Sequence, residues 1–394
     1  MTHHLMNTYG RLPVAFTHGV GCRVFDEHGK AYLDAMAGVA VNTLGHGHPR
    51  LVQALSEQVG RLMHASNLYR IREAEELSDK LAALAAMDEV FFCNSGCEAN
   101  EAAIKLARLY GHTVLGIEQP AVIVMEHAFH GRTLATLSAT GNRKVQAGFE
   151  PLVSGFVRIP FDDLAAVEQV AAHNPNVVAV LFEPVQGEGG IHAAHHPFMR
   201  ALREICTRKQ WLFMVDEVQC GIGRTGIWFA HQHTDIRPDV MTLAKGLGAG
   251  VPIGACLAAG PAAGIFKPGS HGSTFGGNPL ACRAALTTLA VMNDDRLVER
   301  AGALGRRLRD SLAAALGGVP GVVEVRGSGL MIGIELDRAC GEIVTRALDK
   351  GLLVNVTAER VIRLLPPLVM SDAEADELVA GLVPVVRDFL GAPA

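Results

Sequence analysis

The 394-residue sequence predicts an α/β protein, with a large domain built on a mostly parallel sheet flanked by helices and a smaller α+β domain. Three observations predict this fold. Short apolar segments alternate with helical segments from residue 50 to 285, as in parallel sheets that are buried on both faces. Five of these apolar segments end directly in polar or glycine-rich loops. After residue 285 the alternation stops, and two helical stretches followed by further strands predict the second domain.

The first predicted unit is an N-terminal segment, residues 1–49, which we expect to pack with the small domain. Residues 21–34 alternate apolar and polar side chains around the turn Asp26-Glu27-His28-Gly29, a pattern typical of a β-hairpin. A glycine- and histidine-rich loop follows. His46 and His48 lie two apart in that loop without a neighbouring carboxylate or cysteine, so we expect hydrogen-bonding residues rather than metal ligands.

The large domain is expected at residues 50–285 and contains the central sheet. A helix is predicted at Glu98–Tyr110, where Glu101 and Lys105 form an i,i+4 pair, and Gly111 ends it. Short continuous apolar runs are typical of buried strands. On this basis the strands are expected at Glu89–Phe92, Ala121–Met125, Val177–Phe182, Trp211–Val215 and Val240–Leu243.

The small domain is expected at residues 286–394. A helix is predicted near 341–350, and Ser371 and Glu374 match a capping box that opens a final amphipathic helix ending at about Leu390. Strands are expected at Val322–Val325, Leu330–Leu336, Leu352–Val356 and Val361–Leu365.

Composition excludes several classes of partner. The net charge of −5 provides no basic face for nucleic acid or an anionic membrane. No leader-like segment opens the chain and no apolar run approaches membrane-spanning length, so we expect a cytoplasmic protein. The eight cysteines are scattered and form no CxxC pair, which predicts reduced thiols rather than disulfides or a zinc site.

Reactive side chains follow the predicted strands, where ligands of parallel sheets bind. Lys245 follows one apolar strand and is succeeded by glycines, and a lysine in such a setting is usually paired or reacts as an amine. Ser95, Gly96 and Cys97 stand where the N–H groups of a helix N-terminus could bind phosphate. Asp216 ends another apolar strand, so its carboxylate requires a cationic partner.

Each residue also has an ordinary interpretation. Lys245 could extend to solvent, Asp216 could pair with an arginine or lysine, and Phe129 could belong to the core. The segment 95–97 could be only a helix cap, and Gln219 could point to solvent. Together, however, an amine, a strand-end carboxylate, a phosphate site and a stacking aromatic ring meet the requirements of pyridoxal phosphate, which forms a Schiff base with lysine.

These segments resemble those of class III, fold-type I pyridoxal-phosphate aminotransferases. The resemblance extends from about Asn7 to Pro367, and the spacing of 29 residues between Asp216 and Lys245 is similar to that of the family. The segments that carry it are NTYGRLPVAF, AGVAVNTLGHGHP, FFCNSGCEANEAAIKLAR, AFHGRT, EPVQGEGG, MVDEVQCGIGRTG, LAKGLGAGVPIGA, HGSTFGGNPLACRAA and VIRLLPPL.

The resemblance implies how the cofactor ring is held. Lys245 would carry the cofactor covalently and, once displaced by substrate, transfer a proton. Asp216 would pair with the protonated ring nitrogen, and Gln219 would reach the phenolic oxygen. Phe129 would cover one face of the ring and Val218 the other.

The resemblance also implies the phosphate site and the assembly. Ser95, Gly96 and Cys97 would hold the phosphate together with Thr274 from a second subunit, which implies a homodimer. Cys97 stands where the family usually has threonine, so its contact must come from the backbone N–H group rather than from a hydroxyl.

Two arginines are implied to bind substrate carboxylates. Arg132 would bind the α-carboxylate of the amino donor, a bidentate task that suits arginine. Arg363 would bind the α-carboxylate of glutamate or 2-oxoglutarate, and Glu188 would pair with Arg363 whenever that carboxylate is absent. Asn42 and Ser273 are further substrate-binding candidates.

The implied reaction transfers the ω-amino group of N2-acetylornithine to 2-oxoglutarate, giving N-acetylglutamate 5-semialdehyde and glutamate in arginine biosynthesis. Alternative donors are succinylornithine, ornithine, succinyldiaminopimelate and 4-aminobutyrate. The segment SNLYRIREAEEL, which borders the pocket in relatives, carries charged Arg70 and Arg72 and leaves this choice open. An intramolecular aminomutase would not need the Glu188–Arg363 pair, and a binding module without catalysis need not retain Lys245. Glu183 is a supporting candidate or a structural carboxylate.

Overall fold

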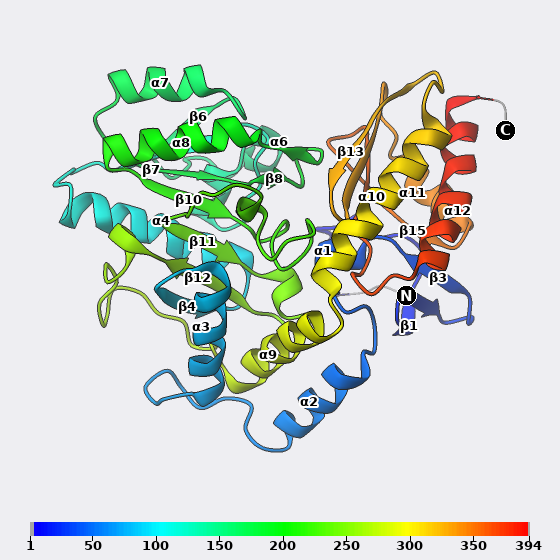
Figure 1. The fold of residues 1–394 in the computed structure, drawn as a ribbon, viewed down its shortest axis with the longest axis horizontal. Coiled ribbons are helices and arrows are strands. Elements are labelled where there is room, and N and C mark those ends of the chain that lie inside the picture. Colours follow the sequence, from blue (N-terminus) through cyan, green and yellow to red (C-terminus); the bar gives the residue numbers. More distant parts are fainter. Residues whose placement is uncertain (1–3, 393–394) are drawn as a thin grey trace.

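A seven-stranded sheet forms the centre of the larger part of the molecule (Figure 1). The computed structural model describes residues 4–392. The strands of this sheet lie in the order β4 (Glu89–Cys93), β12 (Gly254–Ala258), β11 (Val240–Leu243), β10 (Leu212–Asp216), β7 (Val177–Phe182), β5 (Ala121–Met125) and β6 (Phe156–Ile159).

The sheet is mostly parallel, as predicted. Pairs β11–β10, β10–β7, β7–β5 and β5–β6 are parallel, whereas β12 runs antiparallel to both of its neighbours. All five strands expected from the apolar runs are present, and β6 and β12 are additional. Strand β12 returns from the glycine-rich segment that follows β11, and its reversed direction closes the sheet against β4.

Helices cover both faces of the sheet, which explains why its strands are apolar throughout. Alternate residues point to opposite faces. Leu212 and Met214 pack in the same core as α4, whereas Phe213 and Val215 pack in the core that contains α3 and α8. The helices of this part are α2 (Pro49–Val59), α3 (Arg72–Ala85), α4 (Gly96–Thr113), α5 (Leu134–Ala139), α6 (Arg143–Gln146), α7 (Leu164–His173), α8 (His196–Lys209) and α9 (Pro279–Asp294).

Short elements connect these layers near the carboxyl ends of the strands. The hairpin of β8 (Val185–Gln186) and β9 (His192–Ala193) follows β7. Single turns of 3₁₀ helix form η1 (Ala230–His233), η2 (Lys245–Leu247) and η3 (Gly260–Ala262), and α1 (Ala37–Ala40) lies between the two parts of the molecule.

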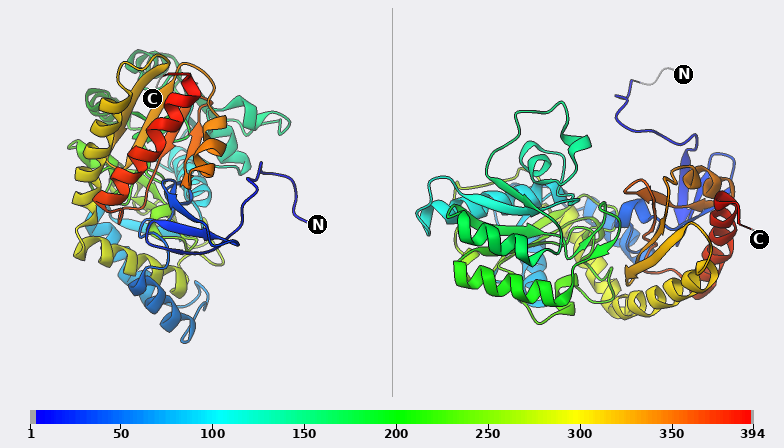
Figure 2. Two further views of the ribbon diagram at one scale, coloured as in Figure 1. Left: turned by 90° about the vertical axis from the view of Figure 1, so that its right-hand side faces the viewer. Right: turned by 90° about the horizontal axis from the view of Figure 1, so that it is seen from above.

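The smaller part combines segments from both ends of the sequence. Its antiparallel sheet has the order β13 (Val322–Ser328), β14 (Met331–Leu336), β17 (Val361–Leu364) and β16 (Asn355–Thr357). Seen from above, the two parts lie side by side, with α10 along the edge of the smaller one (Figure 2). Its helices are α10 (Leu297–Leu316), α11 (Glu342–Asp349) and α12 (Asp372–Leu390). As predicted, Ser371 and Glu374 form the capping box that opens α12.

The N-terminal strands join this smaller part. Strands β1 (Phe16–Val20), β2 (Arg23–Asp26) and β3 (Ala31–Asp34) form a sheet completed by β15 (Leu352–Leu353), and β2 and β3 are the predicted hairpin. The single strand expected at Leu352–Val356 is therefore divided, because β15 pairs with β3 whereas β16 pairs with β17.

This arrangement supports the three-part division of the chain expected from the sequence, at residues 1–49, 50–285 and 286–394. We propose this division with one change, which concerns the boundary at residue 285. Residue 285 falls inside α9, which packs against α2 and α3, so the second boundary is better placed after that helix. Across residues 4–392, none of the helices is long and apolar enough to cross a bilayer.

Candidate active site

A cavity of about 420 Å³ opens where the parallel strands end. The loops after β4, β5, β7, β10 and β11 all contribute to it, as the strand-end argument predicts. The predicted site residues that line it are Ser95, Gly96, Cys97, Phe129, Arg132, Asp216, Val218, Gln219 and Lys245.

Lys245 lies directly after β11 and opens the 3₁₀ turn η2. Its φ angle of 41° places it in the left-handed region, a costly conformation for a lysine that is typical of functional sites. Burial lowers the pKa of Lys245, although the charges of Glu188 and Asp216 oppose this shift. A lowered pKa increases the share of neutral amine, which is the nucleophilic form.

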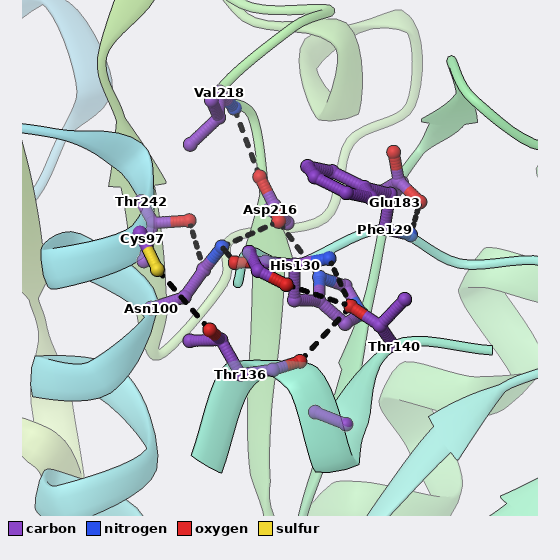
Figure 3. Close-up of polar contacts among 12 residues, drawn as sticks. Cys97, Asn100, Phe129, His130, Thr136, Thr140, Glu183, Asp216, Val218 and Thr242 are labelled. Carbon is purple, nitrogen blue, oxygen red and sulfur yellow. Dashed lines mark hydrogen bonds and ion pairs between the residues drawn. The ribbon is translucent and has the colours of Figure 1, made fainter. Parts of the chain in front are cut away.

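Asp216, at the end of β10, is held by three donors (Figure 3). The backbone N–H of Val218 donates to Oδ1 at 3.0 Å, and Asn100 Nδ2 donates to Oδ2 at 2.7 Å. His130 Nδ1 also lies 2.7 Å from Oδ2. Burial acts to lower the pKa of His130, but its hydrogen bond to Asp216 and the charge of that carboxylate raise the pKa overall. The carboxylate therefore has a fixed position at the base of the cavity.

The N-terminus of α4 forms another wall. Ser95 is the N-cap, and its hydroxyl oxygen accepts a hydrogen bond from the N–H of Glu98 at 3.2 Å. Gly96 is required by close packing, since a Cβ there would stand 2.6 Å from Cγ1 of Val218. The N–H groups in the first turn of a helix have no partner within the helix. This turn can therefore bind an anion in the cavity.

The side chain of Cys97 turns away from that helix end. Its sulfur accepts hydrogen bonds from the backbone N–H groups of Arg132 and Thr133, each at 3.3 Å. It also lies 3.2 Å from the hydroxyl oxygen of Thr136. Cys97 therefore supports the segment that carries Arg132, and only its backbone remains for contact with a phosphate.

The loop after β5 carries Phe129 and Arg132. Glu183, at the end of β7, accepts a hydrogen bond from the backbone N–H of Phe129 at 3.0 Å and so positions this loop. The guanidinium carbon of Arg132 lies 5.9 Å from the centre of the Phe129 ring. Burial raises the pKa of Glu183 to about 7, while the charge of His130 acts in the opposite direction.

An ion pair between a buried arginine and a half-buried glutamate adjoins the cavity. Arg363, on β17, is 1% exposed, and its Nη1 lies 2.6 Å from Oε1 of Glu188 in the β8–β9 hairpin. The same nitrogen donates to Gln219 at 3.3 Å, and Nε donates to Asn355 at 2.8 Å. Burial acts to raise the pKa of Glu188, but the charge of Arg363 and its hydrogen bond lower the pKa overall. Gln219 links this pair to the cavity.

Besides Arg363 and Glu188, three further predicted site residues lie outside the lining of this cavity. Thr274 is exposed, and the Ser273 hydroxyl accepts a hydrogen bond from the N–H of Gly276 in the loop before α9. Both border a second hollow of about 400 Å³. Asn42 lies at the rim of the first cavity, since its Oδ1 is 3.3 Å from the position that a Cβ on Gly250 would take.

Three residues around Asp216 were not predicted from the sequence: Asn100, His130 and Thr242. His130 stands between Phe129 and Arg132 after the same strand, which was a usable signal. His46 makes an ordinary hydrogen bond, with its Nε2 2.8 Å from Asp34 Oδ2. Within residues 4–392, no group of three or more histidine, cysteine or acidic side chains is arranged to hold a metal ion.

Comparison with known proteins agrees with this geometry. The family model "Aminotransferase class-III" matches residues 5–386. The chain belongs to the class-III aminotransferase family. It is 57% identical to the acetylornithine aminotransferase of Nitrosomonas europaea over 98% of both chains.

Solved class-III aminotransferases have the same fold. The ornithine aminotransferase of Toxoplasma gondii superposes with a TM-score of 0.94 at 36% identity, covering 98% of this chain and 93% of that one. The acetylornithine aminotransferase of Elizabethkingia anophelis gives 0.87 at 36% identity, covering 98% and 97%. The predicted fold, a large α/β domain of the fold-type I class with a smaller α+β part, is confirmed.

Class-III aminotransferases use pyridoxal 5′-phosphate, and the cavity fits this group. Lys245 provides an amine whose pKa is lowered. Asp216 provides a carboxylate held by three hydrogen bonds, suited to a protonated ring nitrogen. The first turn of α4 provides N–H groups for a phosphate, and Gly96 lets this turn pack closely against Val218, where a Cβ would clash.

Proposed function

We propose that this enzyme transfers the ω-amino group of N2-acetylornithine to 2-oxoglutarate, giving N-acetylglutamate 5-semialdehyde and glutamate. The observation that carries the proposal is the ion pair of buried Arg363 with Glu188, beside the cavity of Lys245 and Asp216. The relative from Nitrosomonas europaea, named acetylornithine aminotransferase, supports the choice of donor. We place the reaction in arginine biosynthesis in the cytoplasm, where eight free cysteines are expected to stay reduced.

The positions of the cavity residues support a proposed role for each. Bound pyridoxal phosphate supplies an electron sink that stabilises negative charge on the substrate carbon bearing the amino group. Lys245 Nζ attaches the cofactor between turnovers and takes the proton from that carbon. Asp216 would balance the charge of the protonated ring nitrogen, and Gln219 would reach the phenolic oxygen. Phe129 and Val218, which flank Asp216 in Figure 3, would enclose the ring and exclude water.

Substrate carboxylates are assigned to the two arginines. Arg132, exposed at the cavity, binds the α-carboxylate of acetylornithine, with Asn42 at the rim and Ser273 in the second hollow as further candidate contacts. Arg363 binds the α-carboxylate of 2-oxoglutarate or glutamate. Because a buried unpaired charge is costly, Glu188 holds Arg363 while the amino donor is bound and releases it when the acceptor arrives. One pocket can thus accept two differently charged substrates.

A comparison of amino donors tests this proposal. With 2-oxoglutarate as acceptor, we expect kcat/KM for acetylornithine to exceed that for 4-aminobutyrate by at least about 100-fold, because 4-aminobutyrate has its carboxylate one carbon nearer to the amine and lacks the acetamido group, so Arg132 holds it less well when the amine is at the reaction site. Succinylornithine, succinyldiaminopimelate and ornithine complete the series. The likeness to ornithine aminotransferase makes ornithine the second candidate, and a higher kcat/KM for ornithine would replace our assignment.

We further propose a homodimer in which Thr274 completes the phosphate site of the partner. The side chain is exposed and lies outside its own cavity. The neighbouring surface is unusually apolar, with Leu68 88%, Tyr69 71% and Phe275 59% exposed. Asn67 Nδ2 donates to the carbonyl groups of the Ser273 loop at 2.9 Å, which joins these segments into one surface. Exposed apolar patches of this kind are typical of subunit interfaces.

Complementation between inactive variants tests the shared site. Lys245→Ala removes the amine, and Thr274→Asp places a negative charge against the phosphate, so each homodimer should be inactive. When the two chains are refolded or coexpressed together, mixed dimers contain one intact site, and we expect about a quarter of wild-type activity. Tandem affinity tags verify that mixed dimers form. Absence of activity in verified mixed dimers would show that Thr274 serves its own chain.

A further inference from the structure

Asn100 contacts Asp216 from the first turns of α4 and is itself held on both sides of its amide (Figure 3). Its Nδ2 group donates to Asp216 Oδ2 at 2.7 Å and to the backbone carbonyl of His130 at 2.9 Å. Its Oδ1 accepts a hydrogen bond from the hydroxyl of Thr242 at 2.8 Å. Asn100 is 1% exposed and Thr242 is fully buried, so no solvent can replace these contacts.

These contacts select one orientation of the amide. Its NH₂ group faces two acceptors, the Asp216 carboxylate and the His130 carbonyl, whereas its oxygen faces the Thr242 hydroxyl. A flipped amide would bring its oxygen against both acceptors, and two buried acceptors that face each other without a proton repel. The Thr242 hydroxyl supplies the donor that the amide oxygen needs in the observed orientation.

The sheet brings these residues together. Thr242 on β11 is the register partner of Asp216 on the adjacent parallel strand β10. Helix α4, which carries Asn100, packs across both strands. Lys245 follows Thr242 by three residues on the same strand end. The hydrogen bonds from Thr242 to Asn100 and from Asn100 to Asp216 therefore connect the strand of the reactive lysine with the carboxylate on the neighbouring strand.

We propose that Thr242 and Asn100 are positioning residues for cofactor binding: Thr242 orients the Asn100 amide, and Asn100 holds the Asp216 carboxylate where it pairs with the cofactor's ring nitrogen. This inference rests on the proposed function and deepens it. Neither residue lies where it would react with substrate. Both act through Asp216, so their loss should weaken cofactor binding and lower kcat together.

Other charged or titratable groups also surround Asp216 and must be separated from this effect. They come from four loops: His130 after β5, Glu183 after β7, Cys220 after β10 and Lys245 after β11. None of them contacts Thr242 through a hydrogen bond of the described residues. A substitution at Thr242 therefore changes Asn100 and leaves these groups in place.

The central test compares Thr242→Val with Thr242→Ser. Valine has the shape of threonine without the donor, so we expect the dissociation constant for pyridoxal phosphate to rise about tenfold, the effect of one buried hydrogen bond. Serine restores the hydroxyl and should return this constant to within about threefold of wild type. The constant is measured by titrating cofactor into cofactor-free protein and following absorbance, with thermal unfolding of each holoenzyme as a check on folding.

Thr288→Val is the matched control. Thr288 is also fully buried and donates to a carbonyl, that of Ala284 at 2.9 Å, but within α9. We expect this variant to lose stability and keep wild-type cofactor affinity. Wild-type affinity in Thr242→Val, or an equal loss in Thr288→Val, would overturn the proposal. Failure of the wild-type protein to bind pyridoxal phosphate would instead overturn the proposed function.

A second variant tests the inference even if Thr242→Val does not fold. Asn100→Asp keeps the shape and the acceptor for Thr242, but it places a carboxylate against Asp216. At pH 8 we expect cofactor affinity about 100-fold below wild type, with partial recovery toward pH 6 as the new acid becomes protonated and donates to Asp216. An Asn100→Asp protein with wild-type affinity at both pH values would contradict the proposed role of Asn100.

Discussion

Lys245→Ala should abolish transamination, with kcat/KM falling by at least about 10⁴-fold. In the proposed mechanism, the substitution removes both the amine that attaches the cofactor and the base that moves the substrate proton. No other lysine lines the cavity in the described part of the chain. The purified variant should lack covalent cofactor, measured by borohydride reduction of the holoenzyme and mass analysis of the peptide that contains residue 245.

Lys80→Ala is the control for this experiment. Lys80 lies on α3, where its Nζ is 3.2 Å from Glu76 in an exposed i,i+4 pair, and it is not among the residues that line the cavity. It should retain wild-type activity and wild-type cofactor content. Covalent attachment that persists in Lys245→Ala would assign the cofactor to a different lysine and would remove the basis for the proposed mechanism.

Arg363→Ala should separate the two half-reactions. The half-reaction with glutamate or 2-oxoglutarate should lose at least about 100-fold in kcat/KM, because its α-carboxylate loses a buried charged partner. The half-reaction with acetylornithine should lose less than about tenfold, since we propose that Arg132 rather than Arg363 binds its carboxylate. Single-turnover spectroscopy measures each half-reaction by following the cofactor absorbance after one substrate is added.

Arg360→Ala controls for the loss of a positive charge near the same strand. Arg360 lies three residues before Arg363, is largely exposed, and its Nη2 is 2.8 Å from Glu335. The Arg360→Ala variant should keep kcat/KM of both half-reactions near the wild-type values. Equal losses in the two half-reactions of Arg363→Ala would refute the exchange between Glu188 and substrate at Arg363.

Much of the site could be predicted because apolar strands that alternate with helices form a parallel sheet. The loops that follow these strands then lie together at one edge of the sheet. Each apolar run had to be a buried strand, and the carboxyl ends of parallel strands meet at that edge. Lys245 and Asp216 therefore met in one cavity, although 29 residues separate them. The wall formed by Ser95 and Gly96 followed from the same argument, because helix α4 begins directly after β4.

Other features depend on pairing between distant segments, which local patterns do not encode. The run at Leu352–Val356 is one apolar stretch, yet β15 pairs with β3 and β16 with β17. Strand β12 turns back against the parallel strands after a glycine-rich segment. In the first case the partner strands set where each short strand ends, and in the second the partner strands set the direction in which β12 runs.

The chemistry of this protein was determined by its sequence: a lysine and an aspartate after apolar strands, a helix that begins at Ser95, and arginines at 132 and 363. The tertiary structure decided how those groups are held. Asn100 and Thr242 are ordinary polar residues in the sequence. Only the packing of α4 across β10 and β11 buries them beside Asp216, where each has one set of hydrogen-bond partners. The physical reason is that burial removes water as an alternative partner, so three-dimensional neighbours alone determine which hydrogen bonds form.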